Sequence, residues 1–374
     1  MIKVTTQISR VLVGILFIIS GLIKANDTLG FSYKLIEYFE LFGWDLFIPF
    51  AVPAAMAICI FEIISGVALL IGIYVTLNAW LLLILIAFFT WLTGYSAITH
   101  KVTDCGCFGD ALKLTPLQSF LKDVVLFVLI VLIVIGKKNI QPLFNKVINH
   151  IGLFVAFLVT LFFTLYTYMF LPVKDFLPYK IGNNIKELTT VPENAPKDII
   201  EMLFIYEKEG KTYEFSATSL PTDIENYNYI DRKDKLIQEG YRAPIHDFKL
   251  FDSSDVELTE QFFSDTGYKL LLVQTKLNEE LRQLVDPINA LYDYMKESKT
   301  GSFWALTASS KDDIKAYSAE FKNHYTFYNM DAIPLKSMVR SNPGLILLKN
   351  NVVVKKWGAF NFPDPTILKK YIHQ

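Results

Sequence analysis

The chain has 374 residues, with 36 Lys+Arg against 37 Asp+Glu, three cysteines and a hydrophobic fraction of 52%. A net charge of -1 without a basic, aromatic-rich patch argues against nucleic acid as a partner. The charges are unevenly spread, because residues 1–172 hold only ten of the basic and eight of the acidic residues. We therefore expect a membrane part first and a water-exposed part second.

Five segments meet the length and apolarity expected of membrane-spanning helices. The first resembles a signal peptide because Arg10 precedes an apolar run, but it lacks a small-residue cleavage site and ends at Lys24. We expect it to be retained as a span. The five predicted spans are residues 8–24, 51–75, 77–97, 117–135 and 148–171.

Basic residues beside the first four spans divide five to four and weakly favour a cytoplasmic N-terminus. The cysteine pair described below favours the same orientation, since disulfides persist on the oxidising side of a membrane. We predict a protein of the inner (cytoplasmic) membrane, surrounded by lipid, with the cysteine loop and everything after Leu171 in the periplasm or cell exterior and the C-terminal domain periplasmic.

Residues 31–42, between the first two spans, alternate aromatic and charged side chains at helical spacing. This pattern predicts an amphipathic helix on the membrane surface. The alternative is a simple extension of the first span.

Glu62 lies near the middle of the second predicted span, ~17 Å deep by helical rise. Such a residue is either a hydrogen-bonded structural group, facing Ser65, Ser20 or Tyr95, or part of a proton relay or quinone contact. Cys59 is one turn away and is either a small buried hydrophobe or an electron relay.

The polar loop at residues 104–110 contains Cys105 and Cys107, separated by one glycine. A disulfide between them would close a small, strained and easily reduced ring, which favours redox chemistry by both residues. The alternatives are a structural crosslink, incidental thiols, or metal binding with His100, Asp104 and Asp110, a mixed set that does not specify a metal site.

Lys122 and Asp123 stand at the start of the fourth predicted span. They are expected to anchor that helix end at the interface. Asp123 has a second possible role, as a relay group hydrogen-bonded to the loop backbone near Cys105.

The water-exposed part begins with a connector, residues 173–243, that includes a predicted β-hairpin around Gly210. Residues 244–374 then alternate strands and helices, and the strand 268–273, helix 279–295 and strand 302–307 predict a parallel pair. Further strands are expected at 325–328, 345–349 and 352–357, and helices at 311–322, 333–340 and 365–373.

This order resembles the thioredoxin fold, in which a proline before the penultimate strand is usually cis, and it makes Pro343 the candidate. The resemblance has one defect. Residues 274–278, where the thioredoxin family carries its two-cysteine motif, contain no thiol. We expect a thioredoxin-like domain kept for binding or positioning rather than for its own redox chemistry.

The loop string Cys105-Gly106-Cys107-Phe108-Gly109-Asp110 resembles the MauE branch of the DoxX-like membrane proteins. Gly94-Tyr95 before the loop and Lys122-Asp123-Val124 after it match, as do Arg10, Gly14, Phe17, Ser20, Gly21 and Lys24 of the first span. The resemblance covers about residues 5–136. It implies a four-helix bundle linked to disulfide formation in exported proteins and, for the wider DoxX group, contact with quinones. The whole chain is similar to two-domain DoxX proteins.

These observations predict an α-helical bundle over residues 1–136, a fifth span within 137–172, the connector and an α/β thioredoxin-like domain. The predicted function is a membrane thiol-disulfide redox protein in which Cys105 and Cys107 act on an exported client or a periplasmic thiol partner. Glu62, Cys59 and Asp123 are the candidate relay residues; a quinone is the candidate cofactor, and no metal is predicted. The alternatives are a membrane scaffold with a client-binding domain and a metal-handling protein.

Overall fold

The computed structural model describes residues 2–99, 101–102, 106–238, 240–277, 279–298 and 301–372. It divides into two compact units. The first combines Met1–Asn183 with Lys249–Gln374, so that the membrane helices and the C-terminal domain form one unit. The second is Asn184–Phe248.

Within the described residues, five helices are long and apolar enough to cross a membrane, in the regions predicted from the sequence. This confirms a multi-pass membrane protein, since spans of this length match the bilayer. The helices are α1 (Ile2–Asn26), α3 (Ala51–Ile71), α4 (Val75–Thr99), α5 (Pro116–Gly136) and α6 (Lys146–Phe170).

Helices α1 and α3 pack closely because glycines lie where they meet. A Cβ placed on Gly66 would lie 2.7 Å from the Gly14 carbonyl oxygen, and one on Gly21 would lie 3.1 Å from the Cys59 carbonyl oxygen and from the Glu62 Cβ. Arg10 joins the same two helices by donating from Nε to the Leu69 carbonyl at 2.7 Å. This close approach brings Glu62 of α3 up against α1.

Helix α2 (Thr28–Leu41) is a separate helix rather than an extension of the first span. Asp27 interrupts the helical conformation between α1 and α2, with φ -134° and ψ 67°. Its side chain accepts a hydrogen bond from the Gly30 amide. An acidic N-cap of this kind satisfies an otherwise unpaired amide and starts a new helix.

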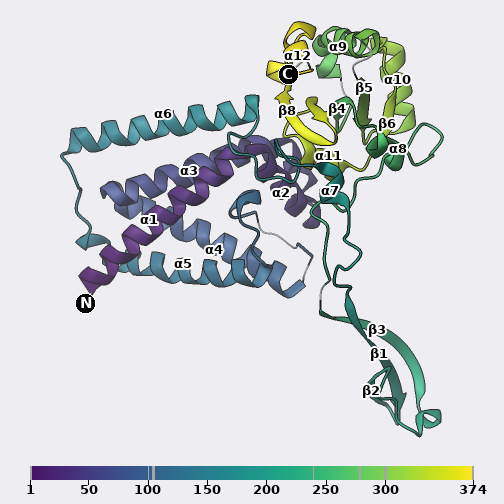
Figure 1. Ribbon diagram of the computed structural model, residues 1–374. Helices are drawn as coiled ribbons and strands as arrows, with labels where there is room; N and C mark the ends of the chain where they lie inside the picture. The colour runs from purple at the N-terminus through teal and green to yellow at the C-terminus, as the bar shows by residue number, and fades with distance from the viewer. Residues whose placement is uncertain are drawn as a thin grey trace. The chain divides into compact units, whose positions relative to one another are not determined.

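The fifth span, α6, packs along α1 and α3 and is tied to the end of α1 (Figure 1). The Thr167 hydroxyl donates to the Ala25 carbonyl at 2.6 Å. Asn26 exchanges two hydrogen bonds with the backbone of Lys174 beyond α6. The chain that leaves α6 is therefore held at Lys174 beside the corner between α1 and α2.

The C-terminal domain has a five-stranded sheet in the order β6-β5-β4-β7-β8. Strands β4, β5 and β6 are parallel, whereas β7 and β8 are antiparallel additions. The strands are β4 (Tyr268–Gln274), β5 (Gly301–Thr307), β6 (Phe327–Asn329), β7 (Gly344–Lys349) and β8 (Val352–Gly358). The helices are α8 (Thr259–Ser264), α9 (Val285–Ser298), α10 (Lys311–Phe321), α11 (Ala332–Met338) and α12 (Pro365–Ile372).

The central strands are apolar runs buried between helices, as expected for a sheet covered on both faces. The topology is thioredoxin-like, and the Asn342–Pro343 bond is cis, as predicted. One helix differs from expectation: the segment predicted as helix 279–295 divides into a 3₁₀ helix, Glu279–Leu284, and α9. A proline at residue 287 falls in the first turn of α9, where a missing amide costs nothing.

The second unit contains α7 (Ile185–Thr189) and a three-stranded antiparallel sheet in the order β2-β1-β3. Strands β1 (Ile199–Lys208) and β2 (Lys211–Ser216) pair around Gly210, where the hairpin was predicted. Strand β3 (Asn228–Gln238) was missed. It is exposed along its whole length and densely charged, so it lacks the half-buried alternation by which strands are recognised.

Candidate functional site

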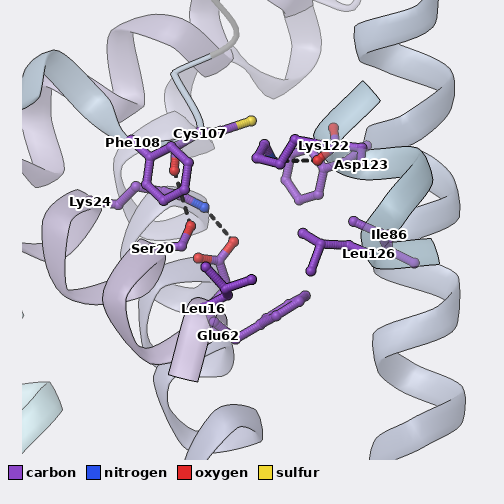
Figure 2. Close-up of a pocket in the computed structure, with 12 residues that line it drawn as sticks. Leu16, Ser20, Lys24, Glu62, Ile86, Cys107, Phe108, Lys122, Asp123 and Leu126 are labelled. Atoms are coloured by element: carbon purple, nitrogen blue, oxygen red, sulfur yellow. Dashed lines mark hydrogen bonds and ion pairs between the residues drawn. The ribbon is translucent and has the colours of Figure 1, made fainter. Parts of the chain in front are cut away.

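A small cavity of about 50 Å³ lies among α1, α3, α4 and α5, below the cysteine loop. Leu16, Phe17, Ile86, Phe89 and Leu126 form apolar walls. Figure 2 shows Cys107 and Phe108 at one end of the cavity, Ser20, Lys24 and Glu62 on one side, and Lys122 and Asp123 on the other.

The first polar group of the cavity is a buried ion pair between Lys24 of α1 and Glu62 of α3. Their side chains are 3% and 4% exposed, and the lysine Nζ donates to Glu62 Oε1. Lys24 Nζ also lies 5.1 Å from the centroid of the Phe31 ring. The attraction of two opposite charges offsets the cost of removing each from water.

Lys24 is a partner that the sequence did not indicate, because the structural alternative for Glu62 named Ser65, Ser20 or Tyr95. The relay alternative for Glu62 stays a prediction. The other carboxylate oxygen, Oε2, is buried with no hydrogen-bond partner within the described part of the chain. A buried carboxylate oxygen without a partner is costly in an apolar bundle, which marks Glu62 as a candidate functional group.

Asp123 is the second polar group, and its side chain is only 1% exposed. Its Oδ2 accepts a hydrogen bond from the Thr93 hydroxyl of α4 at 3.0 Å, and its Oδ1 pairs with Lys122 Nζ. The prediction of an interfacial anchor is therefore wrong for Asp123. The threonine and the lysine together compensate its charge and allow burial inside the bundle.

The cysteine loop closes the upper end of the cavity through Cys107. The Ser20 hydroxyl of α1 donates to the Cys107 carbonyl at 3.0 Å. Gly106 has φ +68°, and a Cβ there would lie 2.9 Å from Lys34 Cγ, so the position requires glycine. Cys105 lies outside the described residues, and the pairing of the two cysteines is therefore not seen.

Cys59 does not line this cavity. It is completely buried in an apolar cluster with Ala25, Phe31, Ala55 and Ile63. This surrounding suits a small hydrophobic side chain, and a relay role for Cys59 stays a prediction.

The metal alternative is only partly addressed by the structure. No group of three His, Cys, Asp or Glu side chains suited to a metal occurs among the residues described. Asp110, one of the expected donors, is held by Arg340 Nη2 at 2.7 Å. His100, Asp104 and Cys105 lie outside the described residues.

The cavity, at about 50 Å³, has room for a few water molecules. A larger groove of about 650 Å³ lies between α4 and α5. Its lining is apolar and aromatic, with Trp91, Tyr95, Phe120 and Phe127 among its residues.

The thioredoxin-like domain contains no cysteine, because all three cysteines of the chain lie at or before Cys107. In particular, the segment from Gln274 to Leu277, at the end of β4, has no thiol. The buried Gln274 occupies the end of β4 instead. Asn342, beside the cis proline, donates to the Lys276 carbonyl at 3.0 Å. The segment after β4 is thus tied to the residue before the cis proline through this hydrogen bond.

The main residue that sequence reasoning missed is the partner of Glu62. Lys24 is ~3 Å by helical rise from the end of α1, whereas Glu62 is ~17 Å from the start of α3. Judged by these positions along their helices alone, the two side chains would be expected at different depths in the membrane. They meet because the α1–α2 corner packs against the middle of α3. Gly21, which lies one turn from Lys24 and against Glu62, is the signal in the sequence that marks the crossing.

Fold and site together define a multi-pass membrane protein with a thioredoxin-like domain. Residues 2–136 match the family model of methylamine utilisation protein MauE. Residues 200–239, which form the three-stranded sheet, match a domain of unknown function (DUF8463).

Along nearly its whole length the chain is similar to Protein TlpB of Flavobacterium psychrophilum. The two are 27% identical over 360 residues, which cover 86% of this chain and 90% of TlpB.

Solved structures similar to this chain include two proteins described by thiol-disulfide activities. The first, described as a protein disulfide isomerase from Bacteroides thetaiotaomicron, shares 12% identity with a TM-score of 0.28 and covers 34% of this chain and 82% of its own. The second, described as thiol:disulfide interchange protein DsbE from Chlorobium tepidum, shares 20% identity with a TM-score of 0.28 and covers 34% and 91%.

Proposed function

We propose that the protein is a membrane thiol-disulfide oxidoreductase with Cys105 and Cys107 as its working pair. The observation that carries this proposal is the position of Cys107 over a cavity that contains two buried carboxylates. Polar groups so costly to bury are kept in a membrane bundle mainly where they handle protons or ligands. The similarity of residues 2–136 to MauE supports a site within this bundle.

The proposed reaction is exchange between the loop disulfide and a client dithiol. A client thiolate attacks one loop sulfur to form a mixed disulfide, and the second client thiolate then displaces the loop. The client leaves with one disulfide, the loop keeps two thiols, and the two protons lost by the client end on the loop sulfurs. The reverse reaction balances equally.

Within this proposal the residues of the cavity move protons. The carboxylates of Glu62 and Asp123, which line the cavity, can accept a proton from a loop thiol through water in the cavity, and return it. Lys24 and Lys122 balance their charges. The cations also favour the thiolate form of a nearby cysteine, which is the reactive form.

The oxidant that restores the loop disulfide is proposed to be a membrane quinone, which takes up two electrons and two protons. The groove between α4 and α5 has the size and the apolar, aromatic lining for such a molecule. Oxidation of the reduced protein by a short-chain quinone, slowed by Trp91→Ala, would support this site. Equal rates for both proteins would reject it.

The proposed location is the inner membrane, with the cysteine loop and the C-terminal domain in the periplasm. The Arg340–Asp110 ion pair supports one part of this topology, because it joins the loop to the domain. Both must then lie on the same side of the bundle.

The direct test is a redox titration of the purified full-length protein in nanodiscs. After equilibration in glutathione buffers and acid quenching, a mass-tagged maleimide reports the free thiols. We expect two loop thiols to appear together as the buffer becomes reducing. Cys59→Ala should leave this step unchanged and Cys107→Ser should abolish it, whereas labelling independent of the buffer would refute the proposal.

A membrane scaffold remains the second candidate, favoured by the absence of thiols from the thioredoxin-like domain. A scaffold predicts that Cys107→Ser leaves the capture of its exported partner intact. The redox proposal predicts that this variant changes the yield of mixed-disulfide complexes. Metal handling would instead appear as stoichiometric metal in elemental analysis of the purified protein.

A further inference from the structure

Arg340 is a buried arginine that joins the C-terminal domain to two parts of the membrane bundle. It follows α11 and stands two residues before Asn342 and its cis bond to Pro343. Its side chain is 7% exposed, although guanidinium groups are seldom buried without several partners.

Each nitrogen of this guanidinium has a defined partner. Nε pairs with the Asp27 carboxylate, at 2.8 Å to Oδ2 and 3.1 Å to Oδ1. Nη2 donates to Asp110 Oδ2 at 2.7 Å, and Nη1 donates to the Lys336 carbonyl. The planar fork of arginine can bridge two carboxylates in this way, whereas the single ammonium of lysine presents a point charge.

The charges around Arg340 hold it in the ionised form. Burial alone lowers the pKa of Arg340, but the carboxylates of Asp27 and Asp110 raise it, and the net result is a pKa above the ordinary value. The Tyr33 ring lies 5.5 Å from the guanidinium carbon and adds a cation–π contact. Because Arg340 pairs with both carboxylates, removing its charge would leave two like charges near each other, with side chains only 13% and 26% exposed.

The two carboxylates that pair with Arg340 are each close in sequence to a residue that lines the cavity. Asp110 is three residues after Cys107 in the loop, and Asp27 is three residues after Lys24, which pairs with Glu62. On the other side, Arg340 is close in sequence to Asn342, which closes the segment at Lys276. The Arg340 side chain thus connects the part of the thioredoxin-like domain next to the cis proline to the cysteine loop.

We propose that Arg340 is a positioning residue that docks the C-terminal domain on the cysteine loop and holds Cys107 over the cavity. The inference rests on the proposed function of the cysteine pair, but its contact geometry is separate from that chemistry. Through this contact the domain, which has no thiols of its own, sets the position of the described part of the loop that contains Cys107.

Two variants test the contact between Arg340 and the loop. Asp110→Asn weakens only the loop contact and leaves the Arg340–Asp27 pair in place. Arg340→Gln removes both contacts, and Arg340→Lys should restore only part of them. A matched control is Lys311→Gln, since Lys311 pairs with Asp255 at 2.7 Å on the exposed surface of the same domain.

The experiment measures hydrogen exchange of residues 106–112 and the alkylation rate of the loop thiols against pH in the full chain in nanodiscs. In Asp110→Asn and Arg340→Gln we expect the rates of hydrogen exchange in the loop and of thiol alkylation to rise about tenfold. This is the factor that goes with loss of a hydrogen bond between charged groups. The pH dependence of the alkylation rate should shift in the same two variants. Lys311→Gln should match the wild type, and the double variant should resemble Arg340→Gln.

Two results separate this inference from the proposed function. If the wild type shows a redox transition that both variants keep, with unchanged exchange in the loop, the role of Arg340 is refuted. If the wild type shows no redox transition but Asp110→Asn still frees the loop, docking stands and the thiol chemistry fails. Should Arg340→Gln not fold, Asp110→Asn decides the matter alone.

Discussion

At the scale of single residues, the bundle is organised by charges that the sequence alone could not pair. Glu62 was recognisable as costly, because it stands in the middle of an apolar span. Its partner was not, because the choice among Lys24, Ser20, Ser65 and Tyr95 depends on where the helices cross. Asp123 was misjudged for the same reason, since its burial depends on Thr93 of another helix.

The Lys24–Glu62 pair gives the first prediction. Glu62→Gln leaves the lysine charge buried without its counter-ion, and breaking a buried pair in this way costs roughly 3–5 kcal/mol. We expect a clear fall in the thermal midpoint in detergent, measured by scanning fluorimetry.

The double variant Lys24→Met with Glu62→Gln should recover most of the loss, because neither side chain then carries a charge. Additive losses from the two substitutions would show that the groups do not interact.

A buried lysine in the thioredoxin-like domain gives the second prediction. Lys269 Nζ donates to the Phe262 and Asp265 carbonyls and, at 2.6 Å, to Asn351 Oδ1. Lys269→Met leaves these acceptors unpaired, at a cost of about 1–3 kcal/mol for each buried group. The thermal midpoint should fall by several degrees. Lys349→Met, on the exposed end of the neighbouring strand, should change it little.

At the scale of elements, the sequence located the spans and most strands but not their ends. Apolar runs are long in the spans and short in the sheet, so length and periodicity separate them. The 3₁₀ segment before α9 and the strand β3 were missed, because the first is an irregular start and the second lacks an apolar face.

The glycine contact between α1 and α3 gives the third prediction. In Gly66→Ala the new methyl would lie 2.7 Å from the Gly14 carbonyl oxygen, and overpacking of this kind typically costs about 1–3 kcal/mol. We expect a lower thermal midpoint and a disturbed Lys24–Glu62 pair.

Gly152→Ala in α6 is the matched control, because nothing lies within 4 Å of its Cβ position. It should be neutral or slightly stabilising, by up to about 1 kcal/mol, as alanine is the better helix former. Equal destabilisation by both substitutions would contradict a specific contact at Gly66.

At the scale of the whole molecule, the division into a membrane part and a charged part was readable from composition. The thioredoxin-like topology was also predictable, since strands and helices alternate and Pro343 precedes the penultimate strand. What the sequence could not predict is that the domain and the bundle form one unit, because this depends on contacts between distant residues such as Asp27 and Arg340.

In the proposed function, the molecule as a whole separates two tasks that thioredoxins combine. The thioredoxin-like domain would supply a binding surface without thiols, and the bundle would supply the cysteine pair with a cavity of buried charges beside it. The account depends on those cysteines being oxidisable and exposed on the outer side of the membrane.

Thiol trapping in intact cells with a membrane-impermeant, mass-tagged maleimide tests that claim most directly. We predict no labelling of the loop in untreated cells and labelling of both Cys105 and Cys107 after reduction, in a Cys59→Ala background. Labelling that is unaffected by reduction, or that occurs only after the cells are lysed, would contradict the account.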